Sequence, residues 1–131
     1  MMYNQLHKLY LTLQTGEGFS VRKDFMTYKR NTGYAVGGAV PGAVYETANE
    51  SLSFIAFEEM MDTLRKSITD EDHQIIGAWV DDHGTAFIEV SDVVQSIGVA
   101  MQLAEMRNEK AIYSFEDGKS IDNPKFILEL S

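Results

Sequence analysis

Hydrophobic and polar residues alternate most regularly in residues 74–94, QIIGAWVDDHGTAFIEVSDVV. Two alternating runs flank a short polar segment formed by Asp82, His83 and Gly84. The glycine supplies the left-handed residue that a short hairpin loop closed by a bulge requires. The pattern therefore predicts a β-hairpin at the centre of the fold.

The two faces of this predicted hairpin differ in character. One face is apolar throughout and is the predicted core side; it carries Ile76, Ala78, Val80, Ala86, Ile88 and Val90. The opposite face carries Trp79, Phe87 and Glu89. Gly77 lies beside Trp79 on that face and leaves backbone uncovered, an arrangement by which a sheet makes room for a flat ligand. The pattern alone does not identify the ligand.

Apolar residues at helical intervals predict three helices. The first covers residues 2–14 and ends before Gly16. The second, of about four turns, carries its apolar stripe from Phe54 to Ile68. The sequence allows more than one N-cap for this helix: Thr47, in a capping box with Glu50, or else Ser51 or Ser53. The third begins at Ser96 and closes at Arg107 and Asn108, because asparagine tolerates the left-handed position at a helix end.

Shorter alternating runs predict the remaining strands. They cover residues 19–25, 34–36 and 111–115, with a tight turn at Asp117–Gly118 and an edge strand over 126–130. Glycines around Pro41 predict a loose loop after the second of these strands. The expected fold class is α+β: an antiparallel sheet with a central hairpin, packed against two main helices, in a single domain spanning residues 1–131.

Composition narrows the functional classes. The 131 residues include no cysteine, which excludes disulfides and cysteine-ligated zinc. No apolar run approaches the about 18 residues of a membrane span, and the N-terminus lacks the pattern of a secretory signal. We therefore expect a cytoplasmic protein that does not bind a membrane.

The net charge of the chain limits which ligands and partners it can bind. The formal net charge is −9, which disfavours nucleic acid as a ligand because phosphate contacts depend on Lys and Arg. An anionic ligand therefore has to find a local basic patch. Basic residues gather in an early group and a later one: Arg22, Lys23, Lys29 and Arg30, then Arg65, Lys66 and Arg107.

Catalytic and metal-binding motifs are weak in this sequence. His83 follows Asp81 and Asp82, a pattern that fits a base with its orienting carboxylate or part of a metal site, but also the ordinary composition of a hairpin turn. The turn interpretation is preferred, since the sequence shows no further ligand or nucleophile. The glycine-rich segment 33–42 lacks the Lys-Ser/Thr ending of a phosphate loop. We expect no catalytic residue, no metal, no cofactor and no enzymatic activity.

Aromatic and polar residues supply the candidate site. Tyr34, Trp79 and Phe87, together with Tyr113, are candidates for stacking on a base, although core packing explains each of them as well. Arg107 and Asn108 could hold a phosphate or a ribose, although helix capping explains them as well.

One resemblance extends these hypotheses. The succession runs through Gly33-Tyr34-Ala35-Val36, Gly77-Ala78-Trp79-Val80-Asp81, Glu89-Val90-Ser91, a helix, and Asn108 before Ala111-Ile112-Tyr113. Over residues 33–121 it resembles the first family of Thoeris anti-defence proteins, which bacteriophages encode. The resemblance implies a small non-catalytic homo-oligomer, a dimer or larger, that works in the cytoplasm of the infected bacterium. It also implies sequestration of a cyclic ADP-ribose isomer, or of a cyclic dinucleotide, as an immune signal.

The family's pockets use an aromatic ring with Arg and Asn or Asp side chains. Residues of suitable type here are Trp79 or Phe87, Asp92, Arg107 and Asn108. The alternative from another class is an acidic inhibitor that mimics nucleic acid and docks on a basic host defence factor, because 20 acidic residues outnumber 11 basic ones. The apolar, glycine-rich segment 37–41 independently favours contact with a second copy of the chain.

Overall fold

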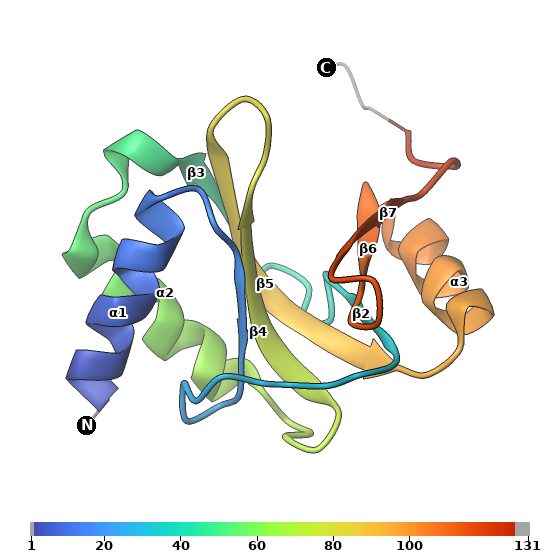
Figure 1. Cartoon of the computed structure of the whole chain (residues 1–131), viewed down its shortest axis with the longest axis horizontal. Coiled ribbons are helices and arrows are strands. Elements are labelled where there is room, and N and C mark those ends of the chain that lie inside the picture. The colour runs from blue at the N-terminus through green and yellow to red at the C-terminus, as the bar shows by residue number, and fades with distance from the viewer. Residues whose placement is uncertain (1, 128–131) are drawn as a thin grey trace.

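Seven antiparallel strands form one sheet in the computed structural model, which describes residues 2–127 (Figure 1). The helices are α1 (Met2–Gln14), α2 (Phe54–Ser67) and α3 (Ile97–Arg107), and a 3-10 turn, η1 (Asn49–Ser51), precedes α2. The strands are β1 (Phe19–Val21), β2 (Tyr34–Val36), β3 (Val44–Ala48), β4 (Gln74–Val80), β5 (Thr85–Val94), β6 (Ala111–Ser114) and β7 (Lys119–Asp122). Their order in the sheet is β1-β4-β5-β2-β6-β7, and β3 also pairs with β5.

The β4–β5 hairpin lies at the centre of the sheet, as the sequence predicts. Its register runs from Gln74 opposite Asp92 to Val80 opposite Ala86. The turn is closed by the Asp81 carboxylate, which accepts backbone N–H groups of His83 and Thr85, each at 2.9 Å. The Thr85 N–H in particular lowers the pKa of Asp81. The acidic residue in this turn therefore has a structural role, since its side chain accepts hydrogen bonds from the turn backbone.

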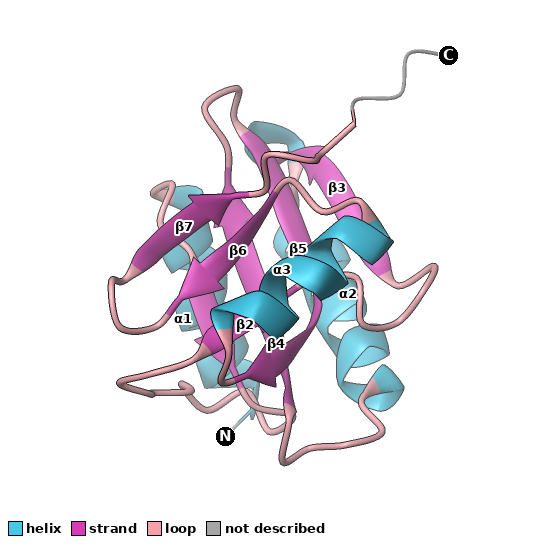
Figure 2. Ribbon diagram, turned by 90° about the vertical axis from the view of Figure 1, so that its right-hand side faces the viewer, coloured by secondary structure: helices cyan, strands magenta, loops and turns pink. Residues whose placement is uncertain are grey.

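Strand β5 is long enough to serve two neighbours along one edge. Its first half pairs with β3, and its last three residues pair with β2. The sheet therefore curls, with β6 and β7 set apart from β4 and β5 (Figure 1). Figure 2 shows α3 on one side of this curled sheet and α1 and α2 on the other, so that all three helices lie on its outer surface.

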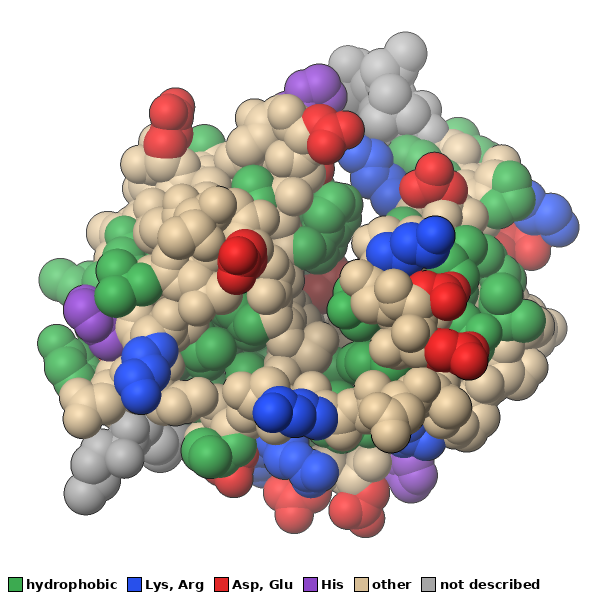
Figure 3. Space-filling model, viewed as in Figure 1, with side chains coloured by type: hydrophobic (Ala, Val, Ile, Leu, Met, Phe, Trp, Pro, Cys, Tyr) green, Lys and Arg blue, Asp and Glu red, His purple; other side chains and the backbone are tan. Residues whose placement is uncertain are grey.

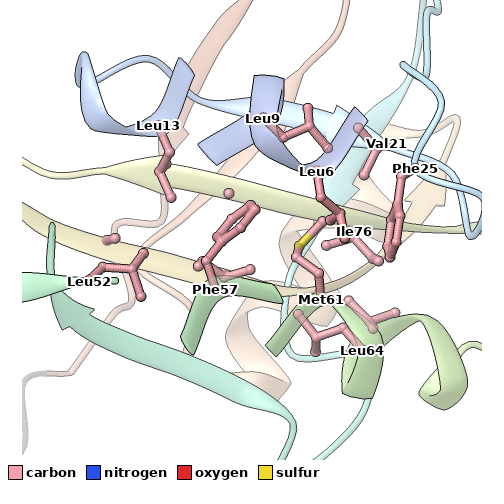
Figure 4. Close-up of a cluster of buried hydrophobic side chains, with 14 of the residues drawn as sticks. Leu6, Leu9, Leu13, Val21, Phe25, Leu52, Phe57, Met61, Leu64 and Ile76 are labelled. Carbon is pink, nitrogen blue, oxygen red and sulfur yellow. The ribbon is translucent and has the colours of Figure 1, made fainter. Parts of the chain in front are cut away.

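The main core lies between α1, α2 and the outer face of the hairpin (Figure 4). Ser53 begins α2, and its side chain accepts the backbone N–H of Ala56. Apolar side chains at helical spacing then face the sheet, and the fully buried members of this cluster include Leu13, Phe57, Met61, Leu64, Ile76, Ile88 and Val90. The predicted core face of the hairpin is therefore the face that the helices cover.

Helix α3 closes a second, smaller core. Its Ala100 and Ala104 pack on Val36 and Ile112 of β2 and β6. Asn108 ends the helix with φ 50° and ψ 49°, the left-handed conformation predicted for it. The α+β fold with a central antiparallel hairpin is confirmed, and α3 covers the end of the sheet that α1 and α2 leave free.

Two local predictions were wrong, one strand was not predicted, and a further predicted strand lies mostly outside the described residues. Residues 44–48 form strand β3 rather than a loop that leads into a helix cap, so Thr47 lies in a strand and Ser53 is the cap. The first strand ends at Val21, because Phe25 turns the chain with φ 68° and Asp24 accepts the Met26 N–H at 3.0 Å. The strand that follows Gly118 covers 119–122. The predicted edge strand over 126–130 falls mostly outside the described residues, and the described residues Phe126 and Ile127 are not strand.

A buried amide connects the end of α1 to the turn before α2. Asn49 is 8% exposed; its Nδ2 donates to the Leu13 carbonyl at 2.9 Å, and its Oδ1 accepts from Gln14 at 3.1 Å. Asn49→Ala should lower the free energy of unfolding by about 1–3 kcal/mol, because the Leu13 carbonyl loses its donor in a buried position. Urea denaturation measures this change. Gln14→Ala, at a more exposed end of the same contact, should cost less, and an equal cost would contradict this interpretation.

Candidate ligand-binding site

The inner surface of the curled sheet encloses a cavity of about 850 Å³. Its walls come from β1, β4 and β5 on one side and from β6, β7 and the segment before β7 on the other. In Figure 3 hydrophobic side chains flank this hollow, acidic atoms lie at its depth, and basic side chains lie around its margin. Because the helices pack on the outer surface, the inner surface remains available to a ligand.

The hairpin side of the cavity contains a flat slot. Trp79 stacks on Phe87 with ring centroids 4.6 Å apart and planes 15° from parallel, and the indole is 37% exposed. Gly77 lies two residues before Trp79 on the same face, and a Cβ added there would meet only the Ser91 Oγ, at 3.5 Å. The space beside the indole is therefore open, which is the arrangement that the alternation of β4 predicts.

A second aromatic wall faces the slot. Tyr113 on β6 is 38% exposed and packs edge-on against Phe115, with centroids 5.4 Å apart. Phe115 in turn contacts Tyr28, at 5.6 Å between centroids. All three residues line the cavity. Aromatic faces on both sides make the cavity suited to a planar group.

The segment from 22 to 33, which we call the strap, crosses between β1 and β2 at the cavity mouth (Figure 1). It is anchored by Phe25, which is 1% exposed and holds a left-handed backbone that bulky residues rarely adopt. Tyr28 braces its basic residues, since its hydroxyl accepts from Arg30 at 3.1 Å and the Arg22 guanidinium lies 5.3 Å from its ring centre. The strap thus holds basic side chains at the opening.

Charge in the cavity opposes the charge of the whole chain. The cavity is lined by four cationic side chains, Lys29, Arg30, Lys110 and Lys119, and by two acidic ones, Glu89 and Glu109. The chain as a whole carries −9. The early basic cluster in the sequence therefore contributes to a local patch that can attract an anion.

Two carboxyl groups meet at the depth of the cavity. Glu89 is 8% exposed, and its pKa is raised to about 8, first by burial and then by the neighbouring Glu109 carboxyl, which also shares a hydrogen bond with it. The Gly38 N–H and the Arg107 charge act in the opposite direction without cancelling the rise. A Cβ on Gly37 would overlap the Glu89 carboxyl, so a larger residue there would displace that carboxyl from its present position. At neutral pH the pair therefore retains a proton.

The structure brings only some of the predicted site residues together. Trp79 lines the cavity, and Phe87 supports it by stacking. Tyr34 packs in the small core beneath α3. Tyr113, which the sequence analysis named as a stacking candidate, lines the cavity as well.

The polar candidates are engaged on the other side of the sheet. Arg107 pairs with Asp92 at 2.6 Å and donates to the Gly37 carbonyl at 3.1 Å. Asn108 donates to the Ile127 carbonyl and accepts its N–H, each at 2.8 Å. None of these three lines the cavity, so the contacts with a ligand predicted for them form no part of the proposal below.

Sequence reasoning missed the carboxyl pair and the role of the strap. Glu109 follows the left-handed Asn108, which turns the chain back toward Glu89. Lys29 and Arg30 were noted only as part of a basic cluster. The segment 37–41 was interpreted as a contact for a second copy. In the structure Gly37 packs against Glu89, Ala39 and Val40 are partly buried against the main core, and Pro41 is exposed. Assembly into an oligomer therefore stays a prediction.

Between residues 2 and 127 no group of three or more His, Asp or Glu side chains converges to hold a metal ion. Among the same residues, every helix is too short or too polar to cross a bilayer.

The raised pKa of Glu89 predicts that folding stability falls as the pH rises from 4.5 to about 8. In this interval the folded protein keeps the Glu89 proton, whereas the unfolded chain has released it. The stabilising contribution is therefore complete below the lower value and lost above the upper one. Glu89→Gln should flatten this part of the profile, as measured by urea unfolding across the interval. Glu46→Gln, which changes an exposed carboxyl on β3, should retain the wild-type slope.

The Arg107–Asp92 pair should contribute to folding. Arg107→Ala should lower the free energy of unfolding by about 1–3 kcal/mol, because it removes an ion pair and leaves the Gly37 carbonyl and the Asp92 carboxylate without this donor. A double-mutant cycle with Asp92→Asn, followed by thermal denaturation, measures the coupling. Strictly additive effects would show that the two side chains do not stabilise one another.

No known protein family, curated protein or solved structure matches this chain. The resemblance noted in the sequence therefore has no independent support from these comparisons. What the cavity binds has to be inferred from its own shape, aromatic faces and charges.

Proposed function

We propose that this protein binds a cyclic nucleotide immune signal in its concave cavity and sequesters it without chemical change. The single observation that carries the proposal is a net-cationic, aromatic-lined cavity in a chain of charge −9. A nucleotide combines the two features that such a cavity complements, a planar base and an anionic phosphate.

The size of the cavity fits this ligand class. Pockets for small ligands commonly have volumes of about 300–1,000 Å³, and this cavity measures about 850 Å³. The base would stack on Trp79 above Gly77, and Arg30 on the strap would hold a phosphate near the mouth. Arg30 suits this role because its planar guanidinium donates several hydrogen bonds in a fixed fork.

One observation favours a second function. A buried carboxyl that retains its proton, next to another carboxyl, is an arrangement used for general acid and base catalysis. A nucleotide hydrolase is therefore the alternative within the same cavity. Recovering the ligand after denaturing the complex distinguishes the two: intact ligand supports sequestration, and a stoichiometric or greater yield of product shows an enzyme.

The acidic-inhibitor alternative predicts a different partner. A mimic of nucleic acid would bind a basic host protein through surface carboxylates and would lose it in moderate salt. This alternative would be favoured over nucleotide binding in the cavity by two results together. The wild type would bind no nucleotide, and the Trp79→Ala and Arg30→Ala variants would still retain a host protein.

Binding should depend on both ends of the cavity. We expect isothermal titration with cyclic ADP-ribose isomers and cyclic dinucleotides to show binding that Trp79→Ala weakens by about 1–3 kcal/mol through lost stacking. Arg30→Ala should weaken it by about 1.5–3 kcal/mol through a lost charged hydrogen bond. Lys66→Ala, which removes an exposed cation on α2 outside the cavity, should bind like wild type. If folded wild-type protein binds none of these ligands, the proposal fails.

A further inference from the structure

We propose that two serine hydroxyls, those of Ser20 and Ser91, bind the ribose of the nucleotide, so that the cavity prefers ribonucleotides to 2′-deoxyribonucleotides. This inference rests on the proposed function and names the sugar that the cavity selects. It uses side chains other than Trp79 and Arg30, which are assigned to the base and to the phosphate. Its failure can therefore be separated from a failure to bind nucleotides.

Ser91 carries a hydroxyl that the fold encloses without giving it a partner. The residue is 6% exposed and lines the cavity on the inner face of β5. A Cβ added to Gly77 would lie 3.5 Å from the Ser91 Oγ, so this oxygen lies over the bare backbone of Gly77. No protein group among residues 2–127 hydrogen-bonds it, whereas every side-chain oxygen in that range that is closed off from solvent has a partner. The Ser91 hydroxyl is therefore open to the cavity and available to a ligand.

Ser20 supplies a second hydroxyl on the other side of the same glycine. It lies directly opposite Gly77 in the register of β1 and β4, while its neighbours Phe19 and Val21 face the main core. Ser20 therefore faces inward, where it lines the cavity. Its backbone carbonyl accepts the Tyr28 N–H at 2.9 Å, but its Oγ has no hydrogen bond within the described chain. Two hydroxyls thus flank the glycine floor of the slot.

Glu89, the acidic residue nearest this floor in the register, is engaged elsewhere. It lies opposite Gly77 along the hairpin, but its carboxyl is directed against Gly37, where an added Cβ would overlap it. The carboxyl shares a hydrogen bond with Glu109 and accepts the Gly38 N–H. The two serine hydroxyls therefore remain available beside Gly77 for a neutral polar group of a ligand.

The order of side chains along the hairpin matches the order of groups in a nucleotide. Trp79, Gly77 and Ile75 follow one another at two-residue intervals on the inner face of β4, and the two hydroxyls flank the middle position. Tyr28 of the strap packs against the cluster that contains Ile75, and its hydroxyl accepts from Arg30 at 3.1 Å. Four residues of a strand span about 13 Å, a length comparable with that of a nucleoside monophosphate. A base on Trp79 with its phosphate at Arg30 therefore has its ribose near the two serines.

Hydroxyl groups suit a sugar because each can donate one hydrogen bond and also accept. A ribose 2′-hydroxyl has the same versatility, so it can donate to one serine while it accepts from the other. A 2′-deoxy sugar offers only C–H groups at this position and would leave both serines without a partner. A site that hydrogen-bonds a hydroxyl of its ligand rejects the analogue that lacks it more strongly than an apolar pocket does. The preference for ribose follows from this cost.

Two probes that differ by one oxygen atom test the inference. Adenosine 3′,5′-cyclic monophosphate and its 2′-deoxy analogue have the same base and the same phosphate. The 2′-hydroxyl is the only free hydroxyl on the sugar of the first probe. We expect isothermal titration to show that the wild type binds this ribose probe about tenfold more tightly than the deoxy probe, the scale of two lost neutral hydrogen bonds.

Alanine variants assign the preference to the two hydroxyls. Ser91→Ala and Ser20→Ala should each lower affinity for the ribose probe by about two- to tenfold without weakening the deoxy probe, and the double variant should bind both probes equally. Since neither hydroxyl bonds the protein, the variants should keep the wild-type melting temperature. Ser67→Ala, the matched control, removes a hydroxyl that donates to the Thr63 carbonyl at 2.9 Å on α2, and it should keep the wild-type preference.

Several results would overturn the inference. Equal wild-type affinity for the two probes, or an unchanged preference in the folded double variant, would exclude ribose recognition by the serines while leaving nucleotide binding in place. A clearly lowered melting temperature of Ser91→Ala would show instead that this hydroxyl supports the fold. Failure of the ribose probe to bind would also overturn the inference, and binding of a cyclic ADP-ribose isomer or a cyclic dinucleotide by the same protein would then leave the proposed function standing. Absence of binding by every nucleotide would overturn both.

Discussion

Strict alternation along β5 is the constraint on which the rest of the structure depends. Ile88 and Val90 point outward into the core under α1 and α2, so Phe87 and Glu89 between them must point inward. The same strand extends to pair with both β3 and β2, which curls the sheet and makes the inner face concave. One strand thus separates a dry, helix-covered core from a cavity that can hold a polar ligand. Shifting its register by one residue would exchange the two faces and destroy both.

Missing side chains shape the cavity as much as those that are present. Gly77 leaves a slot beside Trp79, and Gly37 makes room for the Glu89 carboxyl where β2 ends. Desolvation at that position is the main reason that Glu89 keeps its proton, because an ionised carboxylate loses its hydration there. The shape of the cavity and the protonation of Glu89 therefore have one cause, which is the close approach of the backbone to this buried carboxyl.

The sequence predicted what local patterns encode. The hairpin, its two faces, the three helices and the left-handed Asn108 follow from alternation, helical spacing and capping. Strand β3 was missed because every residue in it remains partly or fully exposed and its pairing with β5 is long-range. Asp92 was grouped with Phe87, although an odd separation along a strand places the two on opposite faces. The contact between Glu89 and Glu109 depends on tertiary structure, and no pattern in the sequence predicts it.

The chain carries a negative net charge, whereas the side chains that line its cavity carry a positive one. This difference affects how an anionic ligand would be held. Exposed charges beyond about 8 Å are largely screened at physiological ionic strength, so the total of −9 repels an approaching anion only weakly. Inside the cavity the ligand responds to the nearest groups, the cations of the strap and rim and the two carboxyls at its depth. If both carboxyls were ionised, they would offset half of those four cations. The proton retained by the pair therefore limits the negative charge at the depth of the cavity and preserves the positive potential at its mouth.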